Sequence, residues 1–93
     1  MTTFIMFGKY SMEAVNKMSS KRSEKAAALV KELGGELKAG YALLGKTDLI
    51  LIANFPGVNE AMKASVELAK LLGISFTTSP AMTVDEFDRL LSL

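Results

Sequence analysis

The segment LILIANF, residues 49–55, decides the fold that the sequence predicts. It is apolar at nearly every position and is followed at once by Pro56-Gly57, which indicates a strand buried on both faces that ends at a turn. The segment TFIMFGKY, residues 3–10, is similarly rich in aromatic and branched side chains and predicts a second strand of this kind. The more polar segments 36–44 and 74–79 also have strand character, and we expect them at the edges of the sheet.

The segments between the strands have helical spacing. Apolar positions recur at steps of three and four between Ser11, a predicted N-cap, and Gly34-Gly35, which stops the helix, while Ser19-Ser20 is expected to kink or divide it. A second helix is predicted over residues 58–72, and Thr83 and Glu86 have the spacing of a capping box that begins a short terminal helix. The side chains expected to face the core are Val15, Met18, Arg22 (by its aliphatic stem), Ala26, Leu29 and Leu33 in the first helix, and Val58, Ala61, Met62, Ser65, Leu68, Ala69 and Leu72 in the second.

The resulting order, β-α-β-β-α-β followed by a terminal helix, predicts an α+β fold of the ferredoxin-like type. Such a fold has a four-stranded antiparallel sheet of strand order 4-1-3-2, two helices on one face and, here, a short C-terminal helix. The 93 residues include no linker, internal repeat or low-complexity stretch, so we expect a single domain over residues 1–93.

Composition excludes several kinds of chemistry. The chain has no histidine and no cysteine, which removes imidazole bases, thiol nucleophiles and the usual zinc sites, so no metal or cofactor is expected. The net charge is only +1 and the strand 49–55 is aliphatic, so the sheet lacks the aromatic and basic pattern of nucleic-acid recognition. The N-terminal apolar stretch is too short for a signal-peptide core or a membrane span, which favours a cytoplasmic protein with no membrane partner.

Two helices cover only one face of such a sheet, and the other face cannot be polar. Whichever register holds, large apolar side chains of segments 3–10 and 49–55 point to the uncovered side. Leaving three or four of them in water forgoes on the order of 5 kcal/mol, at roughly 25 cal/mol per Å² of apolar area. We therefore expect a second copy of the chain packed sheet to sheet about a two-fold axis; in the alternative, the terminal helix folds back over part of this face.

Several short motifs resemble those of one known family. They are Gly8-Lys9-Tyr10 at the end of the first strand, ELGGELK at 32–38, LGKTDL at 44–49, FTTS at 76–79, and Thr83-x-x-Glu86-Phe87 in the terminal helix. With these motifs the chain resembles the GYD-domain proteins, small proteins of the dimeric α/β-barrel type, although Thr47 stands where the tyrosine of the family name would be. The resemblance implies a dimeric ferredoxin-like fold and carries no settled activity.

Four residues are candidates for binding a ligand: Lys9, Tyr10, Tyr41 and Asp48. Lys9 and Tyr10 close the first strand, at the rim where a cavity between sheet and helices would open, and Lys9 could hold a carboxylate or phosphate. Tyr41 could line a pocket with its hydroxyl as the polar group, or it could pack in the core or an interface. Asp48 could anchor a ligand, or it could only accept backbone N–H bonds at the end of a hairpin.

The chain is basic in its N-terminal half and acidic in its C-terminal half. Lys17, Lys21, Arg22 and Lys25 form a basic cluster on the first predicted helix, which could meet an anionic partner, pair with the acidic half of a neighbouring subunit, or only face solvent. Neither arginine of the chain lies in the loop after the first strand, where acylphosphatase-like chemistry would need one.

Three functions stay open from the sequence. The first is a small oligomeric domain, not an enzyme, that binds a metabolite in a pocket between sheet and helices or at the subunit interface. The second, implied by the resemblance to dimeric α/β-barrel proteins, is a cofactor-independent enzyme of the oxygenase or isomerase type, in which a tyrosine, lysine or carboxylate would transfer protons. The third is an assembly subunit without a ligand. No residue pattern identifies a catalytic group.

Overall fold

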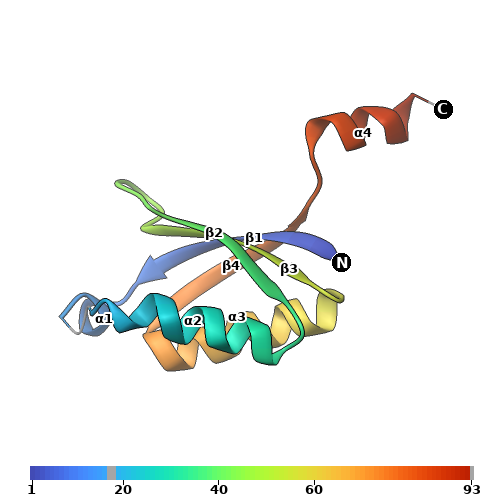
Figure 1. The fold of residues 1–93 in the computed structure, drawn as a ribbon. Coiled ribbons are helices and arrows are strands. Elements are labelled where there is room, and N and C mark those ends of the chain that lie inside the picture. The colour runs from blue at the N-terminus through green and yellow to red at the C-terminus, as the bar shows by residue number, and fades with distance from the viewer. Residues whose placement is uncertain (17–18, 93) are drawn as a thin grey trace.

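The structure, a computed structural model, describes residues 1–16 and 19–92 of the chain. Figure 1 shows its helices and strands in the order β-α-α-β-β-α-β-α. The strands are β1 (Thr2–Tyr10), β2 (Glu36–Ala42), β3 (Leu49–Phe55) and β4 (Ile74–Ala81); the helices are α1 (Met12–Asn16), α2 (Lys21–Glu32), α3 (Val58–Leu72) and α4 (Val84–Leu91). The first predicted helix is thus two helices, and Ser19-Ser20, the predicted point of division, directly precedes α2.

The four strands form one antiparallel sheet of order β2-β3-β1-β4, which confirms the predicted order 4-1-3-2. The two most apolar strands are central, with Ile5 opposite Ile52 and Phe7 opposite Ile50. The more polar β2 and β4 lie at the edges, where polar side chains protect unpaired backbone groups from pairing with other chains.

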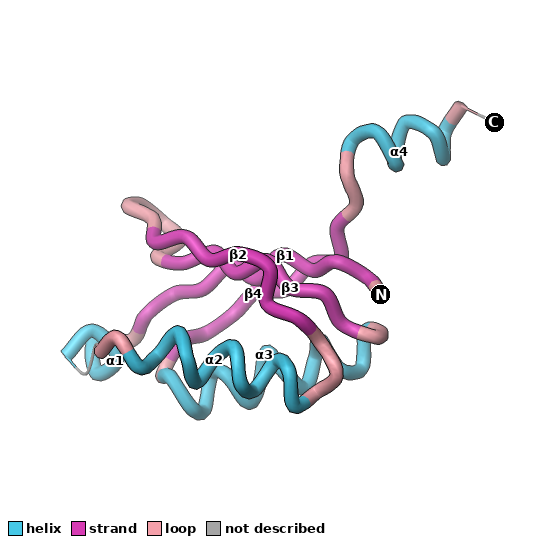
Figure 2. The backbone as a smooth tube through the Cα atoms, viewed as in Figure 1, coloured by secondary structure: helices cyan, strands magenta, loops and turns pink. Residues whose placement is uncertain are grey.

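The helices α1, α2 and α3 lie on one side of the sheet, as the tube view of Figure 2 shows most clearly. The core is between α2, α3 and the near face of β1 and β3, and includes an edge-to-face contact between Phe4 and Phe55 with ring centroids 5.9 Å apart. The buried core residues are Phe4, Met6, Ala26, Val30, Leu51, Ala53, Phe55, Ala61, Ala64 and Leu68.

A β-bulge in β2 corrects one prediction. The alternation of residues 36–44 predicts Leu37, Ala39, Tyr41 and Leu43 on a single face of the strand, but the register shifts between Leu37 and Ala39. Leu37 therefore pairs with buried Ala53 and packs against the core, while Tyr41 pairs with Ile50 and points to the other side. The extra residue of a bulge moves every later residue of the strand to the opposite face. A prediction that assumes strict alternation therefore assigns those residues to the wrong face.

Some helix positions predicted to face the core are exposed. Val15 is exposed and its neighbour Ala14 is buried in its place, and the predicted Met18 lies outside the described residues. In α3 the inward line is Ala61, Ala64 and Leu68, whereas the predicted Val58 and Met62 are exposed. Met62 follows Ala61 by about 100° around the helix axis, which turns it away from the sheet. Small alanines on the inward line let α3 lie close to the sheet.

The alternative in which the terminal helix folds back over the sheet is not observed. β4 continues through Pro80 to Ala81, which an edge strand tolerates because it needs only one ladder of hydrogen bonds. Thr83 caps α4 as predicted, since its Oγ1 accepts from Glu86 N at 3.1 Å. No residue of α4 is buried, and Figure 1 shows the helix projecting away from the sheet instead of covering it. Within the described residues, no helix is both long and apolar enough to cross a membrane.

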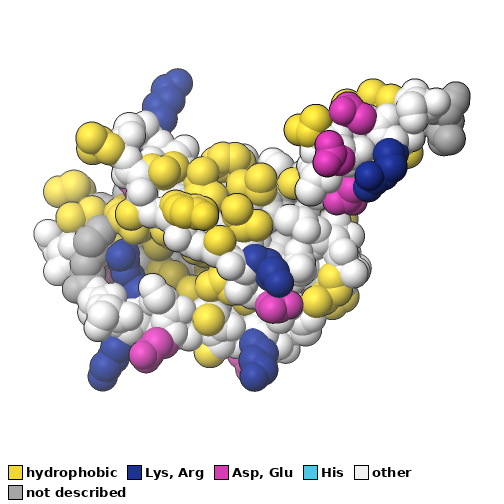
Figure 3. All heavy atoms as spheres, turned by 45° about the horizontal axis from the view of Figure 1, so that its top comes forward, with side chains coloured by type: hydrophobic (Ala, Val, Ile, Leu, Met, Phe, Trp, Pro, Cys, Tyr) yellow, Lys and Arg dark blue, Asp and Glu magenta, His cyan; other side chains and the backbone are white. Residues whose placement is uncertain are grey.

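The side of the sheet opposite α1–α3 carries exposed apolar side chains, and we call it the helix-free face. Figure 3, which turns this face toward the viewer, shows hydrophobic side chains gathered over it. Phe7 is 36% exposed and Tyr41 is 58% exposed, although each lies opposite a residue of the central strand β3. Its apolar members are Ile5, Phe7, Ala39, Tyr41, Ile50 and Ile52.

Candidate ligand site

Three of the four residues singled out from the sequence meet at one end of the sheet. The backbone N–H of Tyr10 donates to Asp48 Oδ2 at 2.9 Å, and Lys9 Nζ donates to the carbonyl oxygen of Lys46 at 3.0 Å. The backbone N–H of Asp48 in turn donates to the carbonyl oxygen of Gly8 at 2.9 Å. Asp48 and Lys9 therefore fasten the β2–β3 hairpin to the end of β1.

Tyr41 lies elsewhere. It is on the helix-free face, opposite Ile50 in β3, whereas Tyr10 follows Phe4, Met6 and Gly8 on the face that the helices cover. Because the sheet separates the two tyrosines, Tyr41 does not line a cavity together with Tyr10.

Arg22, at the start of α2, extends the cluster at Tyr10. Its guanidinium carbon is 4.9 Å from the centroid of the Tyr10 ring, and its Nη2 donates to Tyr10 Oη at a long distance of 3.5 Å. Its other two nitrogens, Nε and Nη1, are buried and have no hydrogen-bond partner among the described residues. The sequence places the aliphatic stem of Arg22 on the inward face of the helix, and the structure shows that its charged head is largely buried as well.

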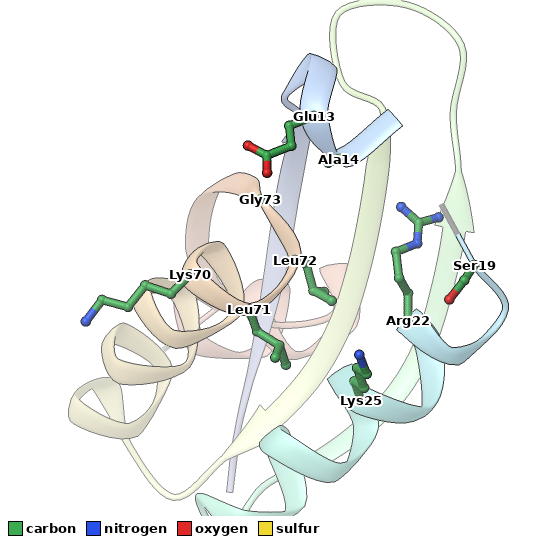
Figure 4. A pocket seen from close by; sticks show the side chains of 9 residues that line it. All are labelled: Glu13, Ala14, Ser19, Arg22, Lys25, Lys70, Leu71, Leu72 and Gly73. Atoms are coloured by element: carbon green, nitrogen blue, oxygen red, sulfur yellow. The ribbon is translucent and has the colours of Figure 1, made fainter. Parts of the chain in front are cut away.

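Arg22 lines a cavity of about 380 Å³ between α1, the start of α2 and the C-terminal turn of α3 (Figure 4). The walls of α1 and α3 are held together, because Ser11 N donates to the carbonyl oxygen of Gly73 at 3.1 Å and Ala14 N donates to Ser11 Oγ at 3.0 Å. The cavity is lined by Glu13, Ala14, Ser19, Arg22, Lys25, Lys70, Leu71, Leu72 and Gly73.

The lining of this cavity carries excess positive charge. Arg22, Lys25 and Lys70 contribute three cations against the single carboxylate of Glu13. Figure 4 shows Arg22 and Lys25 on one side of the cavity, while the side chain of Lys70 extends away from them. An anion entering here is attracted chiefly by the two cations of α2.

A second, smaller cavity of about 50 Å³ lies on the other side of Arg22, and Arg22 and Leu72 line both cavities. Apart from Tyr10, Arg22 and Ser23, its lining is apolar, and it consists of Ala26, Leu49, Leu51, Leu72 and Ile74. A polar, cationic space thus adjoins a small apolar one, which suits a ligand with an acidic head and a short apolar tail.

Sequence reasoning identified only part of this site. The basic cluster of the first predicted helix contains Arg22 and Lys25, and an anionic partner was one of its three predicted interpretations. Glu13, Lys70 and Gly73 were missed, because they come near Arg22 only through the packing of α3 against α1. Among the described residues, no group of three Asp or Glu side chains could hold a metal ion.

Comparisons with known proteins agree with the observed topology. The leucine response regulatory protein LrpA of Mycobacterium tuberculosis has a similar structure, with a TM-score of 0.59 and 6% sequence identity. The match covers 89% of this chain and 51% of the regulator, so this chain spans about half the length of that protein. At this identity the likeness shows the ferredoxin-like fold alone.

No curated protein matches the sequence. The family model of the GYD domain matches residues 4–91, which span every strand and helix described above except the first two residues of β1. The match confirms the resemblance carried by the short motifs of the strand ends and the hairpin. The chain therefore belongs to the GYD domain family.

Proposed function

We propose that the domain binds a small metabolite with a carboxylate head and a short apolar tail in the cavity between α1, α2 and α3. Arg22 carries the proposal, because two of its guanidinium nitrogens are buried without an acceptor among the described residues. A buried donor left unsatisfied costs about 1–3 kcal/mol, and more when it is charged. A ligand that supplies the acceptor recovers this free energy on binding.

The class of ligand follows from the two cavities that share Arg22. The excess of cations in the larger cavity favours an anion, and the aliphatic lining of the smaller one favours a few apolar carbon atoms. The guanidinium nitrogens Nε and Nη1 are screened from solvent in the ligand-free state, so the ligand engages them after the side chain turns toward the larger cavity. Rotamer changes of this size are common on binding.

A titration with 4-methylpentanoate, followed by ¹⁵N NMR of the backbone amides, tests this proposal. The probe has the carbon skeleton of leucine without the amino group, and the regulator with a similar fold is named for its response to leucine. We expect saturable shift changes at residues 13–14, 22–26 and 70–73, with a dissociation constant of about 1 mM, which corresponds to about 4 kcal/mol.

Two controls make the titration specific. The uncharged 4-methylpentan-1-ol has the same tail, and it should cause no saturable change at these amides. The substitution Arg22→Met keeps the apolar stem and should abolish the response, whereas Lys31→Met, an exposed cation of the same helix outside the cavity, should leave it intact. Equal responses of wild type and Arg22→Met would refute the assigned site.

The other two predicted functions give different results in the same experiment. A cofactor-independent enzyme acting on such an acid would change the spectrum of the probe itself over time, as well as the amide shifts. An assembly subunit without a ligand would show no saturable response to 4-methylpentanoate or to inorganic phosphate.

We further propose that the domain works as a homodimer in which the helix-free faces of two copies pack together. The exposed side chains of Phe7 and Tyr41 and the partly buried side chains of β3 support this, because a patch of this kind is stabilised by burial. The ligand cavities lie on the opposite side of each sheet, so both stay accessible in the pair. A cytoplasmic location remains a prediction of the sequence.

A further inference from the structure

We infer that two copies of the chain clasp each other reciprocally, with the hairpin tip of one copy packed against α4 of the other. The hairpin tip is defined here as residues 43–48, between β2 and β3. The inference goes beyond ligand binding and rests on the proposed pairing of helix-free faces.

The hairpin tip presents apolar side chains with nothing to cover them. Leu44 is 104% exposed and Leu43 is also exposed, yet hydrogen bonds hold the backbone of the tip in place. Leu43 N donates to the carbonyl oxygen of Asp48 at 2.9 Å, and Lys9 Nζ holds the carbonyl oxygen of Lys46 at 3.0 Å. A fully exposed leucine on an ordered tip is suited to insert into a complementary surface.

The helix α4 has the complementary features. Its apolar residues are all exposed although the helix is capped and regular, and eight residues of isolated helix are marginally stable in water. At its base lies an apolar groove of about 440 Å³ that Ile5, Ile52 and Met82 help to line. The exposed apolar residues of the helix are Val84, Phe87, Leu90 and Leu91.

The positions of these two features suit a two-fold axis. Figure 1 shows the hairpin tip and α4 at opposite ends of the sheet, both on its helix-free side. β1 gives the same positions, because Gly8 pairs with Leu49 beside the hairpin, whereas Thr3 pairs with Ala81 just before α4. The hairpin tip lies on the β2–β3 side of the sheet and α4 follows β4 at the other edge, so the two are at diagonally opposite corners. A two-fold axis that lies between the faces and is perpendicular to this diagonal brings the hairpin tip of each copy to α4 of the other.

Charge favours this orientation over the alternative. α4 carries Asp85, Glu86 and Asp88 against Arg89. At the other end, Lys46 on the hairpin tip and Lys9 beside it outnumber the single carboxylate of Asp48, which accepts from the backbone N–H of Tyr10. An axis perpendicular to the diagonal places the acidic helix against this basic end. An axis running along the strands would instead place the two acidic helices at the same end of the pair, where they repel.

Because the chain has no cysteine, engineered cysteines can test the clasp without background. A Leu44→Cys chain is mixed with a ¹⁵N-labelled Leu90→Cys chain under mild oxidation, and mass spectrometry identifies the mixed covalent dimer. The matched control replaces Leu90→Cys with Val66→Cys, an exposed apolar position on α3 on the other side of the sheet. We expect the mixed disulfide to form at least about tenfold faster with Leu90→Cys than with Val66→Cys, as proximity raises effective concentration.

The results separate the clasp from the pairing on which it rests. Equal rates with Leu90→Cys and Val66→Cys, in a chain that sediments as a dimer, would overturn the clasp and leave the pairing of faces intact. A chain that sediments as a monomer would overturn both, while the titration with 4-methylpentanoate would still test ligand binding independently. The substitution Leu44→Ser provides a second measurement, and we expect it to raise the dissociation constant of the dimer by about tenfold.

Discussion

At the scale of single residues, Arg22 has a place in the fold and, in the proposed site, a place in ligand binding. The stem of Arg22 lies where the helical spacing predicts a core position, while its guanidinium lies against Tyr10 with two nitrogens unsatisfied among the described residues. The sequence could predict that the side chain turns inward. It could not predict the missing acceptor, because that depends on every neighbouring element.

Removing the unsatisfied charge should stabilise the ligand-free protein. For Arg22→Met we expect the free energy of unfolding to rise by about 1 kcal/mol, since the apolar stem remains and the unpaired donors are gone. Urea denaturation without ligand measures the change. If the free energy of unfolding instead fell by more than about 1 kcal/mol, the contact of Arg22 with Tyr10 would stabilise the protein more than the unsatisfied donors destabilise it.

The Asp48 carboxylate has a role that the structure makes explicit, since it accepts the backbone N–H of Tyr10 at 2.9 Å. Asp48→Ala should lower the free energy of unfolding by about 1.5–3 kcal/mol, the range for a hydrogen bond to a charged group, and Asp48→Asn should lower it less because an acceptor oxygen remains. Thermal and urea unfolding of the two variants provide the measurement. A fully stable Asp48→Ala protein would refute this structural role.

At the scale of elements, every predicted strand and helix exists, but side-chain faces were harder to predict than the elements themselves. Strand character came from composition and from the positions of Pro56 and the paired glycines, which are local properties. The face of Tyr41 depends on the bulge between Leu37 and Ala39, and a bulge is specified by pairing with β3. The residue pattern of one strand does not show how that strand pairs with a distant strand, so the bulge could not be predicted.

The turn between α2 and β2 gives a test at this scale, because Gly34 and Gly35 are glycines for different reasons. Gly34 has a positive φ of 82°, while a Cβ at Gly35 would lie 2.5 Å from the carbonyl oxygen of Asn54. Gly35→Ala should therefore lower the free energy of unfolding by about 1–3 kcal/mol, because the backbone must move to make room for the Cβ.

Gly57→Ala is the matched control for Gly35→Ala. A Cβ at Gly57 would meet only the flexible end of the Glu60 side chain, so its cost should stay within about 1 kcal/mol. Chemical denaturation compares the two variants. Equal stability of the two variants would show that the backbone near Asn54 can shift at little cost in free energy, which would contradict the prediction.

At the scale of the whole molecule, the sheet order could be predicted from the order of the elements and agreed with strand composition, and the apolar helix-free face could be predicted from the composition of the central strands. The sequence could not predict what covers that face. It left a fold-back of the terminal helix open as the alternative to a second copy, and this alternative is wrong because α4 projects away from the sheet. A second copy of the chain is the cover proposed here for this face.

A charge in the middle of the helix-free face should separate the copies. Ile50 lies between Phe7 and Tyr41, so Ile50→Lys would bury two lysines at the proposed interface and should yield a monomer. Val66→Lys, on the exposed side of α3, is the control and should leave the assembly unchanged. Size-exclusion chromatography distinguishes the two results, and a dimeric Ile50→Lys protein would contradict the assigned interface.

The central claim is that two copies cover each other's helix-free face, and native mass spectrometry of the unaltered chain tests it most directly. The account predicts a species with twice the 10.0 kDa mass of one chain, which persists on dilution to low micromolar concentration. A single species of 10.0 kDa at every concentration would contradict it.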